Sequence, residues 1–158
     1  MKAASIRDLK KELGHLSHGE LMEICLRLTR FKTENKELLT YLLFEASSEN
    51  TYVASIKQFM DDEFELINTS NFFFIRKSIR KILRNVKKFI RYSGNKETEV
   101  TLLLYFCEKM QAFKPSIQHS QQLTNVYHRQ LELAQKVISR LHEDLQYDYN
   151  LEVQRLGT

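Results

Sequence analysis

Glycine and proline are scarce in this sequence, with four glycines and one proline among 158 residues. Folds rich in β-strands use both residues often in their turns, so this scarcity favours an all-α protein with long helices. Tryptophan is absent and cysteine occurs only twice. Cys25 and Cys107 each lie in an apolar stretch, which predicts buried free thiols in a reducing compartment rather than a disulfide.

Long apolar runs are also missing. The longest, Leu102 to Cys107, is far shorter than the ~20 residues that a membrane-spanning helix needs. The first residues become charged at Lys2 and Arg7 before the apolar core of a signal peptide can form. We therefore expect a cytoplasmic protein that does not enter a membrane.

What the sequence does contain is an ordinary globular balance of 42% hydrophobic and 28% charged residues. Apolar residues recur at helical spacing and predict an irregular bundle of about seven helices, without a fixed-period repeat. The first helix ends at Gly14, a residue suited to the left-handed position after a helix. Ser17 and Glu20 form a capping box for the second helix, and Thr33 can cap the third.

Further helices are expected over residues 50–68, from Ser70 or Asn71 to Gly94, and after a cap at Asn95. Pro115 is the clearest break in the chain and separates a bundle of residues 1–114 from a C-terminal helical arm of residues 115–158. The arm is expected to pack on the bundle, giving one domain overall, and to hold one long helix from about 118 to 148.

This arm carries an apolar seam at alternating spacings of four and three: Tyr127, Leu131, Ala134, Ile138, Leu141 and Leu145. The seam is under three heptads long. It can pack back on the bundle or pair with a second copy, so self-association through the C-terminal helix is one of the expected alternatives.

One segment stands apart in charge. From Thr69 to Asn95 the sequence has no acidic residue and eight cations: Arg76, Lys77, Arg80, Lys81, Arg84, Lys87, Lys88 and Arg91. Because the whole chain is only +4, everything outside this segment sums to −4. At ~100° per residue, the cations fall within an arc of about 140°, nearly opposite an apolar arc of about 120°. We call this set of eight cations the basic face.

Three explanations of the basic face remain open. Acidic side chains of the preceding helix, Asp61 to Glu63 and Glu65, can neutralise it within the molecule. Alternatively it binds nucleic-acid phosphates or an acidic protein partner. Phe73 projects near the cations and can stack a base, or it packs under the preceding turn.

The sequence offers no catalytic centre. It has no glycine-rich phosphate loop, nucleophile elbow or His-Glu-x-x-His run. His15, His18 and Glu20 lie close together, but nothing completes the four ligands of a structural metal site. Tyr41, Tyr52, Tyr105 and Tyr127 fit core aromatics with a hydroxyl at the rim. We expect a protein that is not an enzyme and uses no metal or cofactor, and no pattern in the sequence implies a small-molecule ligand.

Two resemblances accompany these patterns. The stretches Leu9–Leu13, Leu16–Leu21 and Arg27–Leu28 resemble the helix–loop–helix of SAP-type DNA-binding motifs, across residues 9–28. The loop is shorter than in that motif, and Glu20 is acidic where a lysine is expected nearby. A capping box between two amphipathic helices explains the same residues.

Over most of its length the chain resembles a family of uncharacterised bacterial all-helical proteins of unknown function. The similar stretches are 77–84, 90–93, 96–99, 104–107 and 141–149. This resemblance implies a bacterial, cytoplasmic protein and brings no activity with it. The residues themselves predict a non-enzymatic interaction module that uses the basic face, or alternatively a nucleic-acid binding protein without sequence preference.

Overall fold

The computed structural model describes residues 1–157 and confirms the all-α prediction. Within those residues it contains eight α-helices and no strand. The chain divides into two compact units, Met1–Phe44 and Glu45–Thr158. No helix among the described residues is both long and apolar enough to cross a membrane.

The N-terminal unit holds α1 (Ile6–Leu13), α2 (His18–Phe31) and α3 (Thr33–Thr40), followed by a π-helical turn, Tyr41–Glu45. The predicted capping box is present: the Ser17 amide donates to Glu20 at 2.7 Å, and the Glu20 amide donates to the Ser17 hydroxyl at 3.3 Å. The Glu20 carboxyl accepts hydrogen bonds from the backbone amide and the side chain of Ser17, and these lower its pKa. The Asn35 side chain donates to the Leu28 carbonyl at 2.7 Å and ties α3 to α2.

Three expectations for this unit were wrong. Gly14 has φ −66°, which any residue adopts, so the end of α1 does not need the left-handed region. Lys32, not Thr33, is the N-cap of α3, and it makes no side-chain capping bond. Cys25 is exposed rather than buried, because α1, α2 and α3 contain no fully buried side chain.

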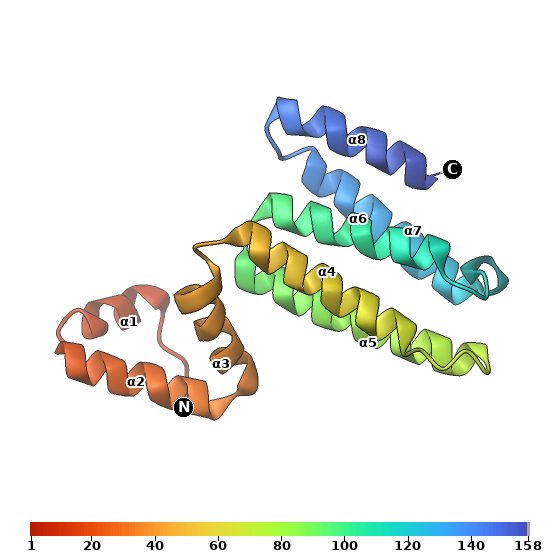
Figure 1. Ribbon diagram of the computed structural model, residues 1–158. Helices are drawn as coiled ribbons and strands as arrows, with labels where there is room; N and C mark the ends of the chain where they lie inside the picture. The colour runs from red at the N-terminus through yellow and green to blue at the C-terminus, as the bar shows by residue number, and fades with distance from the viewer. Residues whose placement is uncertain (158) are drawn as a thin grey trace. The chain divides into compact units, whose positions relative to one another are not determined.

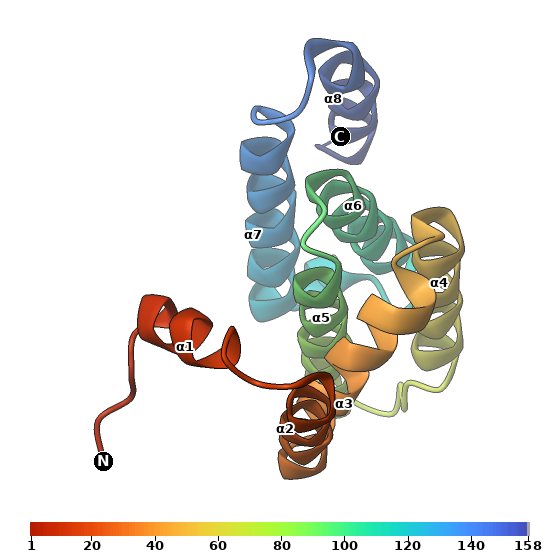
Figure 2. The ribbon, with the colours of Figure 1, turned by 90° about the vertical axis from the view of Figure 1, so that its left-hand side faces the viewer.

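The C-terminal unit holds α4 (Glu49–Glu65), α5 (Phe72–Ser93), α6 (Lys96–Ala112), α7 (Gln121–Ile138) and α8 (Glu143–Gly157), with a 3₁₀ turn at Ile117–His119. Figures 1 and 2 show α6 in the middle of these helices, and it packs against α4, α5, α7 and α8. Its continuous apolar run explains this place. Leu102, Leu103 and Leu104 point in three directions and are all fully buried, as are Phe106 and Cys107.

Tyrosine hydroxyls join the helices of this unit, as the sequence predicted for core aromatics with a hydroxyl at the rim. Tyr52 donates to the Phe89 carbonyl at 2.8 Å, linking α4 to α5. Tyr127 on α7 donates to the carbonyl of Leu156 on α8. Cys107 is buried as predicted, and burial raises the pKa of its thiol to about 12.

The segment predicted as one long helix from about 118 to 148 is two helices, α7 and α8, and the C-terminal one has 15 residues. The break at residues 139–142 lets α8 return along α6 and α7 and bury Val153 and Leu156. The Gln146 side chain stabilises the turn by donating to the Leu141 carbonyl at 2.8 Å.

The first four residues of the predicted seam, Tyr127, Leu131, Ala134 and Ile138, are buried within this unit. Self-association through the C-terminal helix stays a prediction, and α8 exposes Tyr147 and Leu151. Pro115, taken from sequence as the boundary of the arm, separates α6 from α7, two helices that pack on each other. The first compact unit ends at Phe44 and the second begins at Glu45.

Candidate anion-binding surface

Helix α5 forms the basic face because its apolar and cationic residues fall on opposite sides. It starts at Asn71, whose side chain accepts from the Phe74 amide at 3.1 Å, and ends at the left-handed Gly94. Ile75, Ile79, Ile82, Val86 and Ile90 are buried, as the sequence predicted. Arg76 and Lys88 are half-buried, and the other six cations are exposed.

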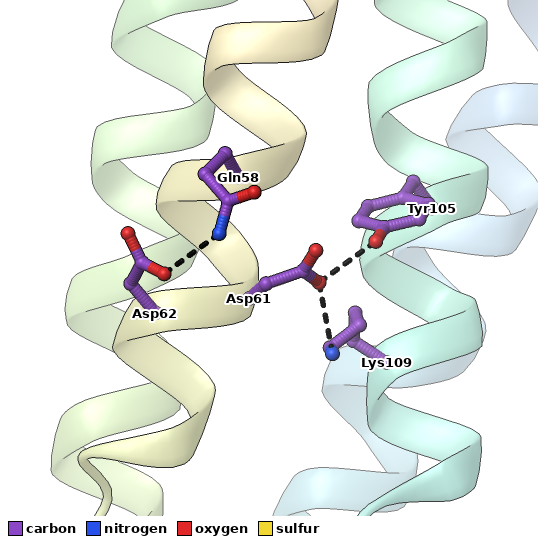
Figure 3. A network of polar contacts seen from close by, with 5 residues as sticks. All are labelled: Gln58, Asp61, Asp62, Tyr105 and Lys109. Carbon is purple, nitrogen blue, oxygen red and sulfur yellow. Dashed lines mark hydrogen bonds and ion pairs between the residues drawn. The ribbon is translucent and has the colours of Figure 1, made fainter.

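Asp61 and Asp62, two of the α4 acids that could neutralise this face, bind other partners. Asp61 points to α6, where it accepts from the Tyr105 hydroxyl at 2.7 Å and pairs with the Lys109 ammonium at 2.9 Å (Figure 3). Asp62 accepts from Gln58 of its own helix at 2.8 Å. Across residues 1–157, no ion pair involves seven of the eight cations: Arg76, Lys77, Arg80, Lys81, Arg84, Lys87 and Arg91.

The groups around Asp61 form a local link between α4 and α6. Partial burial raises the pKa of Asp61, but the hydrogen bonds from Lys109 and Tyr105 outweigh it, so the pKa lies below its ordinary value. Burial, together with the hydrogen bond to Asp61, raises the pKa of Tyr105 to about 12. The Lys57 ammonium lies 4.9 Å from the centre of the Tyr105 ring. The Asp61 carboxylate is therefore already bound by Lys109 and Tyr105 of α6.

Part of the basic face borders a hollow of about 430 Å³ between α5 and α7. We call it the α5–α7 hollow; its lining residues are Phe73, Arg76, Lys77, Arg80, Arg84 and Gln122. The Arg80 guanidinium lies 3.5 Å from the Gln122 side-chain oxygen. Lys81, Lys87, Lys88 and Arg91 belong to the basic face but do not line the hollow.

The electrostatics of the α5–α7 hollow favour an anion. Four of its six lining residues are cations and none is acidic. Gln122 belongs to the first turn of α7, where the backbone amides and the helix dipole present positive charge. A concave surface lined by one sign of charge concentrates counterions of the opposite sign.

Sequence reasoning missed one member of this hollow, Gln122, and left two roles open for another, Phe73. Gln122 is brought beside Arg80 only by tertiary packing, and a glutamine in the first turn of a helix carries no local signal of such a role. Phe73 was expected to pack under the preceding turn or to stack a base. In the structure its side chain is 62% exposed, with the neighbouring ring of Phe74 in edge contact at 5.6 Å.

The histidines, cysteines and acidic residues form no candidate metal site in the part of the chain that the structure describes. Among the described residues, no three of His, Cys, Asp and Glu lie together in a way that can hold a metal ion, and this includes His15, His18 and Glu20. No family model matches the chain, and no match was found among curated proteins or solved structures.

Proposed function

We propose that this protein is a non-enzymatic interaction module that binds an anionic partner through the basic face of α5. The observation that carries the proposal is that seven cations lie together on one helix and form no ion pair within the described residues 1–157. Like charges three and four residues apart on a helix repel, by about 0.2–0.5 kcal/mol per pair. An anionic partner relieves this repulsion and releases bound counterions as it associates.

The dimensions of the basic face suit an extended partner. Arg76 and Arg91 are fifteen residues apart on α5, which gives a cationic strip of about 20–25 Å at 1.5 Å per residue. The resemblance to bacterial helical proteins and the two free thiols, Cys25 and Cys107, support a place in the reducing bacterial cytoplasm.

The second candidate function is nucleic-acid binding without sequence preference. The observation in its favour is the exposed ring of Phe73 beside Arg76 and Lys77, since aromatic and cationic side chains together are typical of surfaces that bind single strands.

Charge reversal tests the proposal. In the variant Arg80→Glu/Arg84→Glu/Arg91→Glu, we expect loss of binding to fluorescent heparin, a general polyanion, at about 0.1 M salt. Helicity by circular dichroism should be unchanged because all three side chains are exposed. For the wild type, log affinity should fall linearly with log salt concentration.

A matched control separates the basic face from net charge. Lys114→Glu/Lys136→Glu/Arg140→Glu makes the same change in charge at positions outside α5, and it should retain most of the binding. Equal loss in both variants would show that only net charge matters. Absence of heparin binding by the wild type at low salt would contradict the proposal outright.

A further inference from the structure

We infer that the α5–α7 hollow is a site for single-stranded nucleic acid, in which one unpaired base stacks on Phe73 while the arginines hold the flanking phosphates. This inference rests on the proposed function, because it names the chemical class of the partner that the basic face binds.

Phe73 supplies the stacking surface. It is the second residue of α5 and lines the α5–α7 hollow with most of its ring in solvent. An apolar ring left in water loses the stabilisation that burial brings, and no core position of α5 requires it there. Every base presents a π-face, so an aromatic ring in a cationic groove binds unpaired bases with little sequence preference.

The arginines supply the phosphate contacts. Arg76, Arg80 and Arg84 recur every four residues along α5 and line the same hollow. The Cα atoms of successive arginines are thus about 6 Å apart along the helix axis, a spacing similar to that of phosphates along an extended strand. None of the three is committed to a carboxylate within residues 1–157. Arginine also binds phosphate through two parallel hydrogen bonds.

Gln122 supplies an amide that can form hydrogen bonds with a base. Its oxygen is 3.5 Å from the Arg80 guanidinium, the outer limit of a hydrogen bond. Its amide NH₂ group offers two further donors. The hollow is open to solvent, and its volume of about 430 Å³ leaves room for a flat group such as a nucleobase.

These features favour a single strand over the other anionic partners. In a duplex both faces of each base are already stacked, so Phe73 would remain in solvent. An acidic protein segment would use the cations but would gain nothing specific from an exposed aromatic ring among them. Only a partner with alternating flat rings and anionic groups uses every side chain of the hollow.

The test compares strands that differ only in their bases. Fluorescence anisotropy would measure the affinity of the full chain for a labelled 12-nucleotide single strand, as DNA and as RNA. The comparison probes are an abasic strand with the same phosphates, a duplex of the same length, and polyglutamate. We expect the single strands to bind at least about five-fold more tightly than the abasic strand.

Variants locate the effect. Phe73→Ala should remove the difference between the normal and abasic strands and leave abasic binding unchanged. Tyr147→Ala, which removes another exposed ring from the same unit, should change neither. Arg80→Gln/Arg84→Gln should weaken both strands and reduce the salt slope by about 1.4, since each lost phosphate contact on a single strand contributes about 0.7.

A second readout does not depend on removing the ring. The chain has no tryptophan, so Phe73→Trp introduces a single indole fluorophore at the proposed stacking position. We expect its emission to be quenched by the single strand and unchanged by the abasic strand.

The outcomes separate the two proposals. Equal affinity for normal, abasic and duplex probes, with no effect of Phe73→Ala and no quenching in the Phe73→Trp variant, would overturn this inference while the proposed function stands. Tighter binding of polyglutamate than of any strand would overturn it in favour of an acidic protein. If no probe binds and Arg80→Gln/Arg84→Gln changes nothing, the proposed function fails as well.

Discussion

Gly94 ends α5 in a backbone conformation that side chains disfavour. Its φ is +63°, and within residues 1–157 it is the only residue in the left-handed region. Its amide donates to the Ile90 carbonyl at 3.0 Å, which closes the last turn of the helix. A Cβ at this position would meet no atom within 4 Å. The cost of replacing this glycine is therefore conformational and not steric.

We expect Gly94→Ala to lower the free energy of unfolding by about 1–2 kcal/mol, the cost of the left-handed conformation for an L-residue. Gly19→Ala is the matched control, since Gly19 lies in the first turn of α2, does not have a positive φ and also has open space around it. That substitution should stabilise the helix by about 0.5–1 kcal/mol. Urea unfolding of the full chain measures the change at Gly94, and the helicity of a peptide of residues 1–44 measures the change at Gly19. A Gly94→Ala variant as stable as the wild type would contradict this account of Gly94.

Single residues also mark how far sequence reasoning reaches. The caps at Ser17 and Asn95 were predicted correctly, because the Ser-x-x-Glu spacing and an asparagine before an acidic first turn are local signals. The exposure of Phe73 and of Cys25 was not predictable in the same way. A ring or thiol in an apolar stretch is buried only if a neighbouring element covers it, and helical spacing does not say which elements do.

Between elements, α4 and α6 are joined by the hydrogen bond from Tyr105 to Asp61. We expect Tyr105→Phe to lower the free energy of unfolding by about 0.5–1.5 kcal/mol near pH 8. The pKa of Tyr105 is about 12 in the folded chain, against about 10 in an unfolded one. Raising the pH from 10 towards 12 therefore ionises the unfolded state first and favours unfolding.

Because Tyr105→Phe removes this titrating group, its stability should fall less than that of the wild type over the same pH range. The free energies of unfolding of the wild type and of Tyr105→Phe, plotted against pH, should therefore approach each other as the pH rises. Tyr147→Phe, at an exposed position on α8, should follow the wild type throughout. Parallel curves for wild type and Tyr105→Phe would contradict the assigned role of this hydroxyl.

The spacing of apolar residues predicted the buried faces of the helices better than it predicted where the helices begin and end. The buried positions of α5 follow the predicted spacing, because a helix with one apolar side can pack in only one orientation. The break between α7 and α8 has no local signal, since residues 139–142 contain neither glycine nor proline and the apolar seam continues through them. The break is stabilised by contacts far along the chain. Val153 and Leu156 of α8 become buried, and the Tyr127 hydroxyl donates a hydrogen bond to the Leu156 carbonyl.

For the molecule as a whole, the fully buried apolar core is concentrated in one unit. Every buried hydrophobic side chain except Tyr41 lies between residues 52 and 156. The N-terminal unit, Met1–Phe44, instead exposes large apolar side chains on each of its helices, among them Ile6, Leu28 and Leu38. Stability should therefore depend on the C-terminal unit.

We expect a chain of residues 45–158 to unfold cooperatively, with a Tm within about 4–8 °C of the full chain, equivalent to about 1 kcal/mol. A peptide of residues 1–44 should instead lose helicity gradually on heating, since so short a chain buries little surface. Thermal circular dichroism of the two pieces distinguishes these behaviours. A broad, non-cooperative transition for residues 45–158 would show that the core needs the first unit.

The candidate site was only partly predictable from the sequence, because part of it is formed by tertiary packing. The cations of α5 all lie within one short segment of the sequence, so the sequence alone was enough to predict the basic face. Two features depend instead on how α4, α6 and α7 pack: seven of its cations have no ion pair within residues 1–157, and Arg80 lies beside Gln122. Asp61 pairs with Lys109 and accepts a hydrogen bond from Tyr105, which are forty-eight and forty-four residues away in the chain. No local sequence pattern predicts these contacts.

The different surroundings of the two cysteines give the natural chain a built-in chemical handle. Cys25 is open to solvent, whereas Cys107 is enclosed and the pKa of its thiol is about 12. Alkylating reagents attack thiolates that they can reach. A fluorophore or spin label can therefore be attached to the N-terminal unit of the folded protein without engineering, while modification of Cys107 marks the moments when the interior opens.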